Sequence, residues 1–228
     1  MNQTAVCHSK EGTDIVQQRY DRIAPVYDLC ERPMEYRVQK WRGDLWEQVS
    51  GKRILEIGAG TGKNVNFYPC GATVTAIDLS QKMLDQARNK AHNRGAEVEF
   101  RLADVQCLPY PDNSFDVAVA TFVFCSVPDP VQGLREVRRV LKPGGRLFLL
   151  EHVLSRKFLL RPLMKILDPV PAHVWGAHID RETTEYVRKA GFIDICQVDL
   201  LLDIVKRIDA KAPAEQRDEY NIATEVWK

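Results

Sequence analysis

The sequence lacks the features of secreted, membrane-spanning and nucleic-acid-binding chains. No run approaches the roughly 18 apolar residues of a transmembrane helix, and the first residues lack the basic and apolar regions of a signal peptide. Lys and Arg (32) nearly balance Asp and Glu (31), so no large electrostatic field favours nucleic acid. These absences predict a cytoplasmic protein without a nucleic-acid partner.

The sequence also lacks closely spaced pairs of cysteines. The six cysteines are scattered, and no two of them form a C-x-x-C pair. Structural zinc sites and redox motifs need closely spaced pairs of this kind. We therefore expect reduced thiols and no metal site.

What remains is the pattern of an ordinary α/β globule. The length of 228 residues suits one domain with a substantial core. Apolar strands alternate with helical periodicity, which favours a parallel sheet with helices on both faces. The sequence predicts helices at 81–93, 130–141 and 183–190, and strands at 53–57, 73–77, 98–103, 115–120, 146–150, 193–200 and 220–227.

A glycine-spaced turn follows the first predicted strand. Glu56 leads into Gly58, Gly60 and Gly62, a G-x-G-x-G spacing rather than the G-x-G-x-x-G of dinucleotide sites. Glycine suits such a turn because a side chain would block close approach of a ligand to the backbone. The turn predicts a cofactor site at the carboxyl end of the strand. A purely structural tight turn is the alternative.

Acids end the next two strands as well. Asp78 lies within about 20 residues of the glycines, where such folds keep a ribose-binding acid. Its alternative role is an N-cap, although Ser80 can serve as the cap of the following helix. Asp104 can accept the adenine amino group, and the Val105 amide can face a ring nitrogen. The predicted cofactor site also includes Leu79 and, at the end of the fourth strand, Thr121.

The string E-I-G-A-G-T-G at 56–62 resembles motif I of class I S-adenosylmethionine (SAM) methyltransferases. The L-K-P-G-G turn at 141–145 is also typical of that family. The alternative is that the turn does no more than end a helix before a strand. The resemblance covers about residues 50–228. It implies SAM as cofactor, methyltransferase activity, and a Rossmann-like, seven-stranded, mostly parallel sheet whose last strand is antiparallel.

The amino-terminal segment carries a second resemblance. The string Y-D-x-x-A-P-x-Y-D at 20–28 resembles the branch that contains ubiquinone and menaquinone C-methyltransferases and bacterial phospholipid N-methyltransferases. It implies that residues 1–49 form a helical lid over the SAM pocket. Tyr20 would then contact the cofactor, and Tyr27 would take part on the acceptor side. Interface-packing aromatics are the alternative.

An insertion at 152–180 is expected to shape the acceptor pocket. His152 and His178 could take a proton near neutral pH, and hydrogen-bonded loop histidines are the alternative. Glu151, His173, Trp175 and Asp180 lie nearby in sequence. Residues 156–167 mix apolar and basic side chains, which indicates transient contact with the inner face of a membrane. An ordinary buried cap is the alternative.

The sequence therefore predicts methyl transfer to an amphipathic acceptor, a small molecule or a lipid. A phospholipid amine head group is the first expectation, and a small or lipophilic thiol or a prenylated quinone precursor comes next. The E-H-V string at 151–153, with the Trp-containing insertion, is similar to membrane-associated methyltransferase-like proteins that act on lipophilic thiols. A non-catalytic SAM-binding protein is the alternative from another class.

Overall fold

A computed structural model describes residues 10–155, 164 and 181–214. Its seven-stranded sheet has the order β3-β2-β1-β4-β5-β7-β6. The strands are β1 Arg53–Ile57, β2 Thr73–Asp78, β3 Val98–Leu102, β4 Phe115–Thr121, β5 Leu141–His152, β6 Ile193–Leu201 and β7 Val205–Lys211. β1 to β5 are mutually parallel, and β7 is antiparallel to both of its neighbours. The predicted α/β class and mostly parallel sheet are confirmed.

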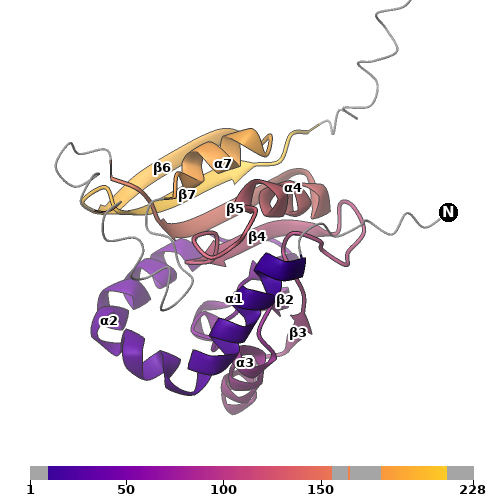
Figure 1. Cartoon of the computed structure of the whole chain (residues 1–228). Coiled ribbons are helices and arrows are strands. Elements are labelled where there is room, and N and C mark those ends of the chain that lie inside the picture. The colour runs from indigo at the N-terminus through magenta and orange to yellow at the C-terminus, as the bar shows by residue number, and fades with distance from the viewer. Residues whose placement is uncertain (1–9, 156–163, 165–180, 215–228) are drawn as a thin grey trace, which may run out of the picture.

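Helices cover both faces of this sheet (Figure 1). They are α1 Lys10–Ile23, α2 Tyr27–Trp46, α3 Gln81–Arg94, α4 Pro130–Val140 and α7 Thr183–Lys189, with short 3-10 turns η1 Ala24–Val26 and η2 Val65–Phe67. The carboxyl end of α2 packs with β1, β4 and β5 through Leu45 and Trp46. Leu134 of α4 and Val187 of α7 pack on the other face. Because both faces of the sheet are covered, apolar residues are buried at consecutive positions in β1 (Ile54–Leu55) and β4 (Val117–Ala120).

The seventh strand differs from its predicted position. We expected it at 220–227, which lies outside the described residues, whereas Val205–Lys211 supplies it. Val205, Ile208 and Ala210 are buried in the core, but the charged residues between them obscure the pattern in the sequence. One of these, Lys206, is itself buried and ion-paired with Asp199 of β6. The family resemblance therefore predicted the antiparallel strand correctly but not its residues.

The ends of the helices follow the expected local chemistry. Asp129 caps α4 by accepting from the Gln132 amide at 2.9 Å, and Pro130 occupies its first turn. Gly191 has a φ of +85°, as expected for the residue that follows a helix. β5 begins at Leu141, five residues before the predicted start, with a register shift against β4 at the L-K-P-G-G turn. Among the described helices, none has the length and apolarity needed to span a bilayer.

Candidate cofactor and acceptor site

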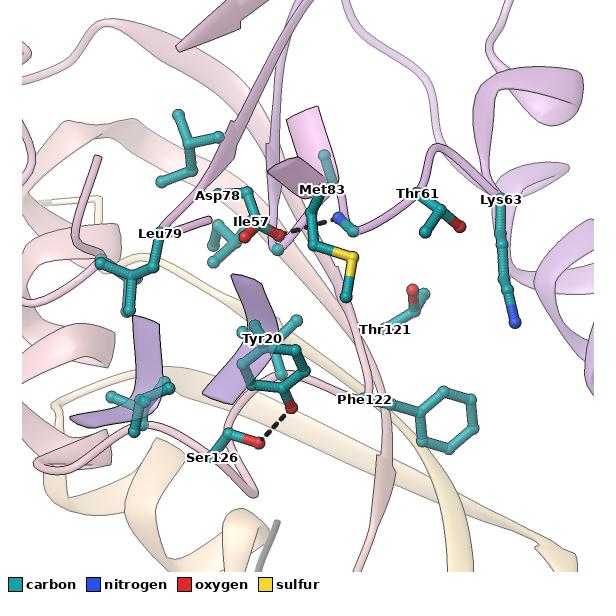
Figure 2. A pocket seen from close by; sticks show the side chains of 18 of the residues that line it. Tyr20, Ile57, Thr61, Lys63, Asp78, Leu79, Met83, Thr121, Phe122 and Ser126 are labelled. Carbon is teal, nitrogen blue, oxygen red and sulfur yellow. Dashed lines mark hydrogen bonds between the residues drawn. The ribbon is translucent and has the colours of Figure 1, made fainter. Parts of the chain in front are cut away.

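A cavity opens where the carboxyl ends of β1, β2 and β4 meet α1 and α2 (Figure 2). It encloses about 810 Å³ of space, part of it open to solvent. The lining comes mostly from strand ends and the two amino-terminal helices: Val16, Tyr20, Tyr27, Arg42, Ile57, Gly58, Ala59, Gly60, Thr61, Lys63, Ile77, Asp78, Leu79, Met83, Ala103, Val105, Thr121, Phe122, Val123, Ser126 and Val127.

The three glycines of the turn have different surroundings. A Cβ on Gly58 would lie 2.4 Å from Val123 Cγ2, and one on Gly62 would lie 2.9 Å from the Ala87 Cα of α3. These two glycines permit close packing of the turn. Gly60 lines the cavity, and a Cβ on it would meet no protein atom within 4 Å. Its φ is +53°. Backbone is thus exposed to the cavity at Gly60, as a cofactor turn requires.

Asp78 connects the end of β2 to this turn. Its Oδ2 accepts from the Gly60 amide at 2.8 Å, and its Oδ1 accepts from the Ser80 amide at 2.8 Å. Ser80 Oγ accepts from the Met83 amide at 3.1 Å, so Ser80 caps α3 and Asp78 does not. Burial raises the pKa of Asp78, while its backbone donors lower it. Each carboxylate oxygen keeps a further lone pair, which fits a pair of ribose hydroxyls.

The third strand-end acid contacts α1. Asp104 Oδ2 accepts from Thr13 Oγ1 of α1 at 3.0 Å, and Oδ1 accepts from the Gln106 amide at 2.8 Å. Val105 and Ala103 line the cavity, whereas Asp104 is not among its lining residues. An adenine contact by Asp104 therefore stays a prediction, and it would compete with Thr13. The Val105 position is compatible with the predicted role.

A buried polar network connects Glu56 of β1 with residues that line the cavity. Glu56 accepts from Asn64 Nδ2 at 2.6 Å and from the Tyr68 hydroxyl, and burial raises the pKa of Glu56 to about 7. Arg42 Nη1 of α2 donates to Asn64 Oδ1 at 3.0 Å and to Thr121 Oγ1 at 2.5 Å. Within the described residues, Arg42 Nε makes no hydrogen bond, but it lies 3.7 Å from Glu35 Oε1, which balances its charge beside the cavity.

The two tyrosines of the amino-terminal string both line the cavity. The Tyr20 hydroxyl lies 2.7 Å from Ser126 Oγ, a contact shown in Figure 2, and burial raises its pKa. The Tyr27 ring lies under the Lys63 ammonium, 5.2 Å from its centroid. The two rings also pack against each other at 6.4 Å. The rings pack together and line the cavity, and contact of Tyr20 with the cofactor and of Tyr27 with the acceptor side stay predictions.

The segment after β4 supplies Phe122, Val123, Ser126 and Val127 to the cavity wall. Phe122 has a φ of +59°, rare for a bulky residue, and its ring packs on the His152 ring at 4.6 Å. Phe122 lines the cavity but His152 does not. Burial lowers the pKa of His152, which keeps the imidazole neutral near pH 7. His178 lies outside the described residues, as do His173, Trp175, Asp180 and most of the predicted insertion.

Glu151 fixes the backbone of this same segment. Its Oε1 accepts from the amides of Val123 at 2.9 Å and Phe124 at 3.0 Å. The side chain is fully buried, and burial raises its pKa to about 7. Glu151 Oε2 lacks a hydrogen bond within the described part of the chain. The sequence indicated Glu151 only as a neighbour of His152, and its buried position explains why its support role was missed.

Arg42 and Lys63 are cavity residues that sequence reasoning missed. Lys63 follows the glycine turn, and its ammonium bridges Glu31 at 2.5 Å and Glu35 at 2.8 Å on α2. Arg42 lies four residues after buried Val38, a helical spacing that marks an inward position. That spacing was the available signal. Within the described residues, no group of three or more His, Cys, Asp or Glu side chains could hold a metal ion.

Comparison with known proteins agrees with this geometry. A family model described as "Methyltransferase domain" matches residues 55–149. Demethylmenaquinone methyltransferase of Paenarthrobacter aurescens (strain TC1) is 30% identical over 92% of this chain and 91% of its own length. Thiol S-methyltransferase TMT1B of Rattus norvegicus is 40% identical over 62% of this chain and 60% of its own length. The chain therefore spans less than two thirds of the rat relative.

Solved structures share the fold. The crystal structure of the [4+2]-cyclase SpnF superposes with a TM-score of 0.69 at 21% identity, over 89% of this chain and 97% of that one. Together with the glycine turn, Asp78 and the relatives, this places the chain in the class I SAM-dependent methyltransferases, related to quinone C-methyltransferases and thiol methyltransferases. S-adenosylmethionine is the cofactor, and the open space at Gly60 and the acceptor atoms of Asp78 fit it.

Proposed function

We propose that this protein transfers the methyl group of SAM to an apolar acceptor, first of all a ring carbon of a prenylated quinol precursor. The supporting observation is the composition of the cavity wall away from Asp78. Figure 2 shows Tyr20 and Phe122 on that side, and the apolar side chains of Val16, Val123 and Val127 also line the cavity. Such a wall stabilises an aromatic or aliphatic acceptor by removing it from water.

The charged groups of the cavity argue against a charged head group as the acceptor. Lys63 is ion-paired with Glu31 and Glu35, and Arg42 donates to Thr121. An ammonium or phosphate would have to displace these partners. The phospholipid amine that the sequence first suggested therefore ranks last among the three acceptor classes. The relatives' names support the same order, since they refer to demethylmenaquinone and thiol substrates.

Positioning supplies most of the catalysis in this proposal. Bound SAM offers a methyl group already activated by its sulfonium. Holding the acceptor in near-attack geometry can supply roughly 7–11 kcal/mol of the barrier. A quinol carbon also needs loss of a phenolic proton. Tyr27, His152 and His178 stay the proposed participants. Since Phe122 packs between His152 and the cavity, a direct proton transfer to His152 requires the Phe122 ring to move.

A lipophilic thiol is the second candidate acceptor, supported by the 40% identity to the rat thiol S-methyltransferase. A free thiol has a pKa of about 8.5, so about a few per cent of it is already thiolate near pH 7, and the thiolate is a strong nucleophile. The apolar part of the cavity wall would suit it as well as a quinol. The two candidates differ in their dependence on a base, which provides a way to separate them.

The test is transfer of labelled methyl from SAM to three acceptors in detergent micelles: a short-chain demethylated naphthoquinol, a long-chain alkyl thiol and phosphatidylethanolamine. We expect methylated quinol as the main product, identified by mass, with an Asp78→Ala variant as control. A methylated thiol without quinol product would support the second candidate. Product from phosphatidylethanolamine alone would overturn the proposed acceptor class. SAM binding without any transfer would indicate a non-catalytic SAM-binding protein.

Two further parts of the proposal concern organisation and location. We propose residues 1–49 as a lid and 50–228 as the SAM-binding domain; α1 supports this because Val16 and Tyr20 face the cavity. Membrane contact through 156–167 stays a prediction, since nearly all of that segment lies outside the described residues. A peripheral location at a membrane would bring the protein to an apolar acceptor.

A further inference from the structure

The amino-terminal two thirds of α2 separates its charges by sign. Three acids, Asp28, Glu31 and Glu35, recur at spacings of three and four residues and so share one side of the helix. All three turn toward the glycine-turn region. Asp28 accepts from Thr61 Oγ1 and from Lys90 Nζ, both at 2.6 Å, while Glu31 and Glu35 hold the Lys63 ammonium. The three acids are therefore paired with Lys63 and Lys90 on the side of α2 that faces the rest of the protein.

The outward side of α2 carries unusually exposed apolar groups. Tyr36 is 88% exposed and Leu29 is 69% exposed, and Val26, at the junction with η1, is 48% exposed. Apolar residues scattered singly over a surface need no explanation, but these three follow one another at spacings of three and seven along one helix side. Figure 1 shows α2 projecting from the sheet, with its carboxyl end packed and its amino-terminal part at the periphery.

Basic residues accompany this apolar stripe. Arg32, Arg37 and Lys40 are exposed, and within the described residues none of them forms an ion pair or side-chain hydrogen bond. Acids on the same side, Asp44 and Glu47, are confined to the carboxyl end of the helix. The stripe from Val26 to Lys40 is about 21 Å long at 1.5 Å per residue. Apolar side chains with cations beside them and acids turned away are typical of helices that lie in a lipid interface.

We propose that this outer surface of α2, made of Val26, Leu29, Arg32, Tyr36, Arg37 and Lys40, docks on an anionic lipid bilayer. The apolar side chains enter the head-group region, and the three cations contact anionic lipids. The inference rests on the proposed function, because an apolar acceptor resides in the bilayer. Tyr27 and Arg42 of the same helix line the cavity, so docking through α2 places the acceptor site beside the lipid.

Co-sedimentation with vesicles tests the proposal on the full chain. Wild type is mixed with vesicles of phosphatidylcholine alone, or of phosphatidylcholine with phosphatidylglycerol. Arg37→Gln with Lys40→Gln should weaken binding to the anionic vesicles by about twenty-five-fold, since each basic side chain near such a surface strengthens binding about fivefold. Leu29→Ser with Tyr36→Ser should reduce binding by about tenfold or more. Ile193→Ser with Val198→Ser, which removes exposed apolar groups from β6, should bind as the wild type does.

SAM affinity, measured for every variant, shows that each protein is folded and keeps its cofactor site. The proposal is overturned if wild type binds SAM but not anionic vesicles, or binds both vesicle types equally. It is also overturned if the α2 variants sediment like wild type. A wild-type dimer that the Leu29 and Tyr36 substitutions convert to monomer, without vesicle binding, would assign the surface to a second copy. Vesicle binding without methylation of any micellar acceptor would instead defeat the proposed function alone.

Discussion

The Tyr20 hydroxyl lies 2.7 Å from Ser126 Oγ, which joins α1 to the segment after β4 across 106 positions of sequence. Both residues line the cavity, so this bond closes the cavity between the amino-terminal helix and the sheet. Any ligand that enters from this side must pass the contact or open it. The bond therefore links cofactor access to the docking of α1.

Replacement of Tyr20 by phenylalanine should loosen α1. The variant loses a part-buried hydrogen bond and leaves the Ser126 hydroxyl without that partner, at a cost of about 0.5–1.5 kcal/mol. Trypsin cleavage after Arg19 or Arg22 should become faster than in wild type, and SAM should slow the cleavage in both proteins. Tyr36→Phe, at an 88% exposed position, is the matched control and should leave the rate unchanged. Cleavage that SAM does not slow would contradict a lid.

Gly60→Ala should impair SAM binding more than it impairs folding. Its Cβ would occupy space that is empty of protein atoms and faces the cavity. Gly95→Ala is a close control, because Gly95 also has a positive φ and a Cβ there would also meet nothing within 4 Å. Both variants should lose about 1 kcal/mol of stability from the left-handed conformation. Calorimetric titration should show SAM affinity lowered about tenfold or more only for Gly60→Ala. Equal affinities in the two variants would remove this turn from the cofactor site.

Asp78→Ala should lower SAM affinity about ten- to a hundredfold. The ribose hydroxyls would lose a charged acceptor, and hydrogen bonds to charged groups contribute about 1.5–3 kcal/mol. The Gly60 amide would also lose its acceptor, which makes the turn less ordered. Asp85→Ala, on the exposed side of α3, is the control. Calorimetry with both variants measures the difference, and unchanged affinity in Asp78→Ala would mean that the ribose is held elsewhere.

Glu151 should make the protein less stable as pH rises toward neutrality. Burial raises its folded-state pKa to about 7, above the roughly 4.3 of an unfolded chain. Between these values the folded state holds a proton that the unfolded state has released, so the free energy of unfolding falls as pH increases through this window. The contribution is at most on the order of 4 kcal/mol.

Glu151→Gln removes this titration. Urea unfolding at several pH values between 5 and 8 should therefore give a flatter stability profile for the variant than for wild type. Some slope should persist, because burial also raises the pKa of Glu56 to about 7. The exposed Glu97→Gln variant should follow the wild-type profile. Parallel profiles for Glu151→Gln and wild type would show that Glu151 does not titrate in this window.

The strand ends were the part of the site that sequence could predict. The glycine spacing and the acids at 56 and 78 depend on local backbone and periodicity, and both occupy the predicted places. Arg42 was missed because an arginine inside a polar helix reads as a solvated side chain, although it is 6% exposed. The positive φ of Phe122 has no sequence signal, since it depends on tertiary contacts such as the Glu151 carboxylate that holds the next two backbone amides.

The hairpin of β6 and β7 has a consequence for synthesis. β7 follows β6 in the chain but lies between β5 and β6, so β5 keeps an open edge until β7 has been made. At roughly 5–20 residues per second, that interval lasts some seconds on the ribosome. During it, the apolar stretch from Leu147 to Leu150 can pair with another nascent chain, as unprotected edges do. Premature termination between β5 and β7 should therefore yield aggregates rather than smaller soluble domains.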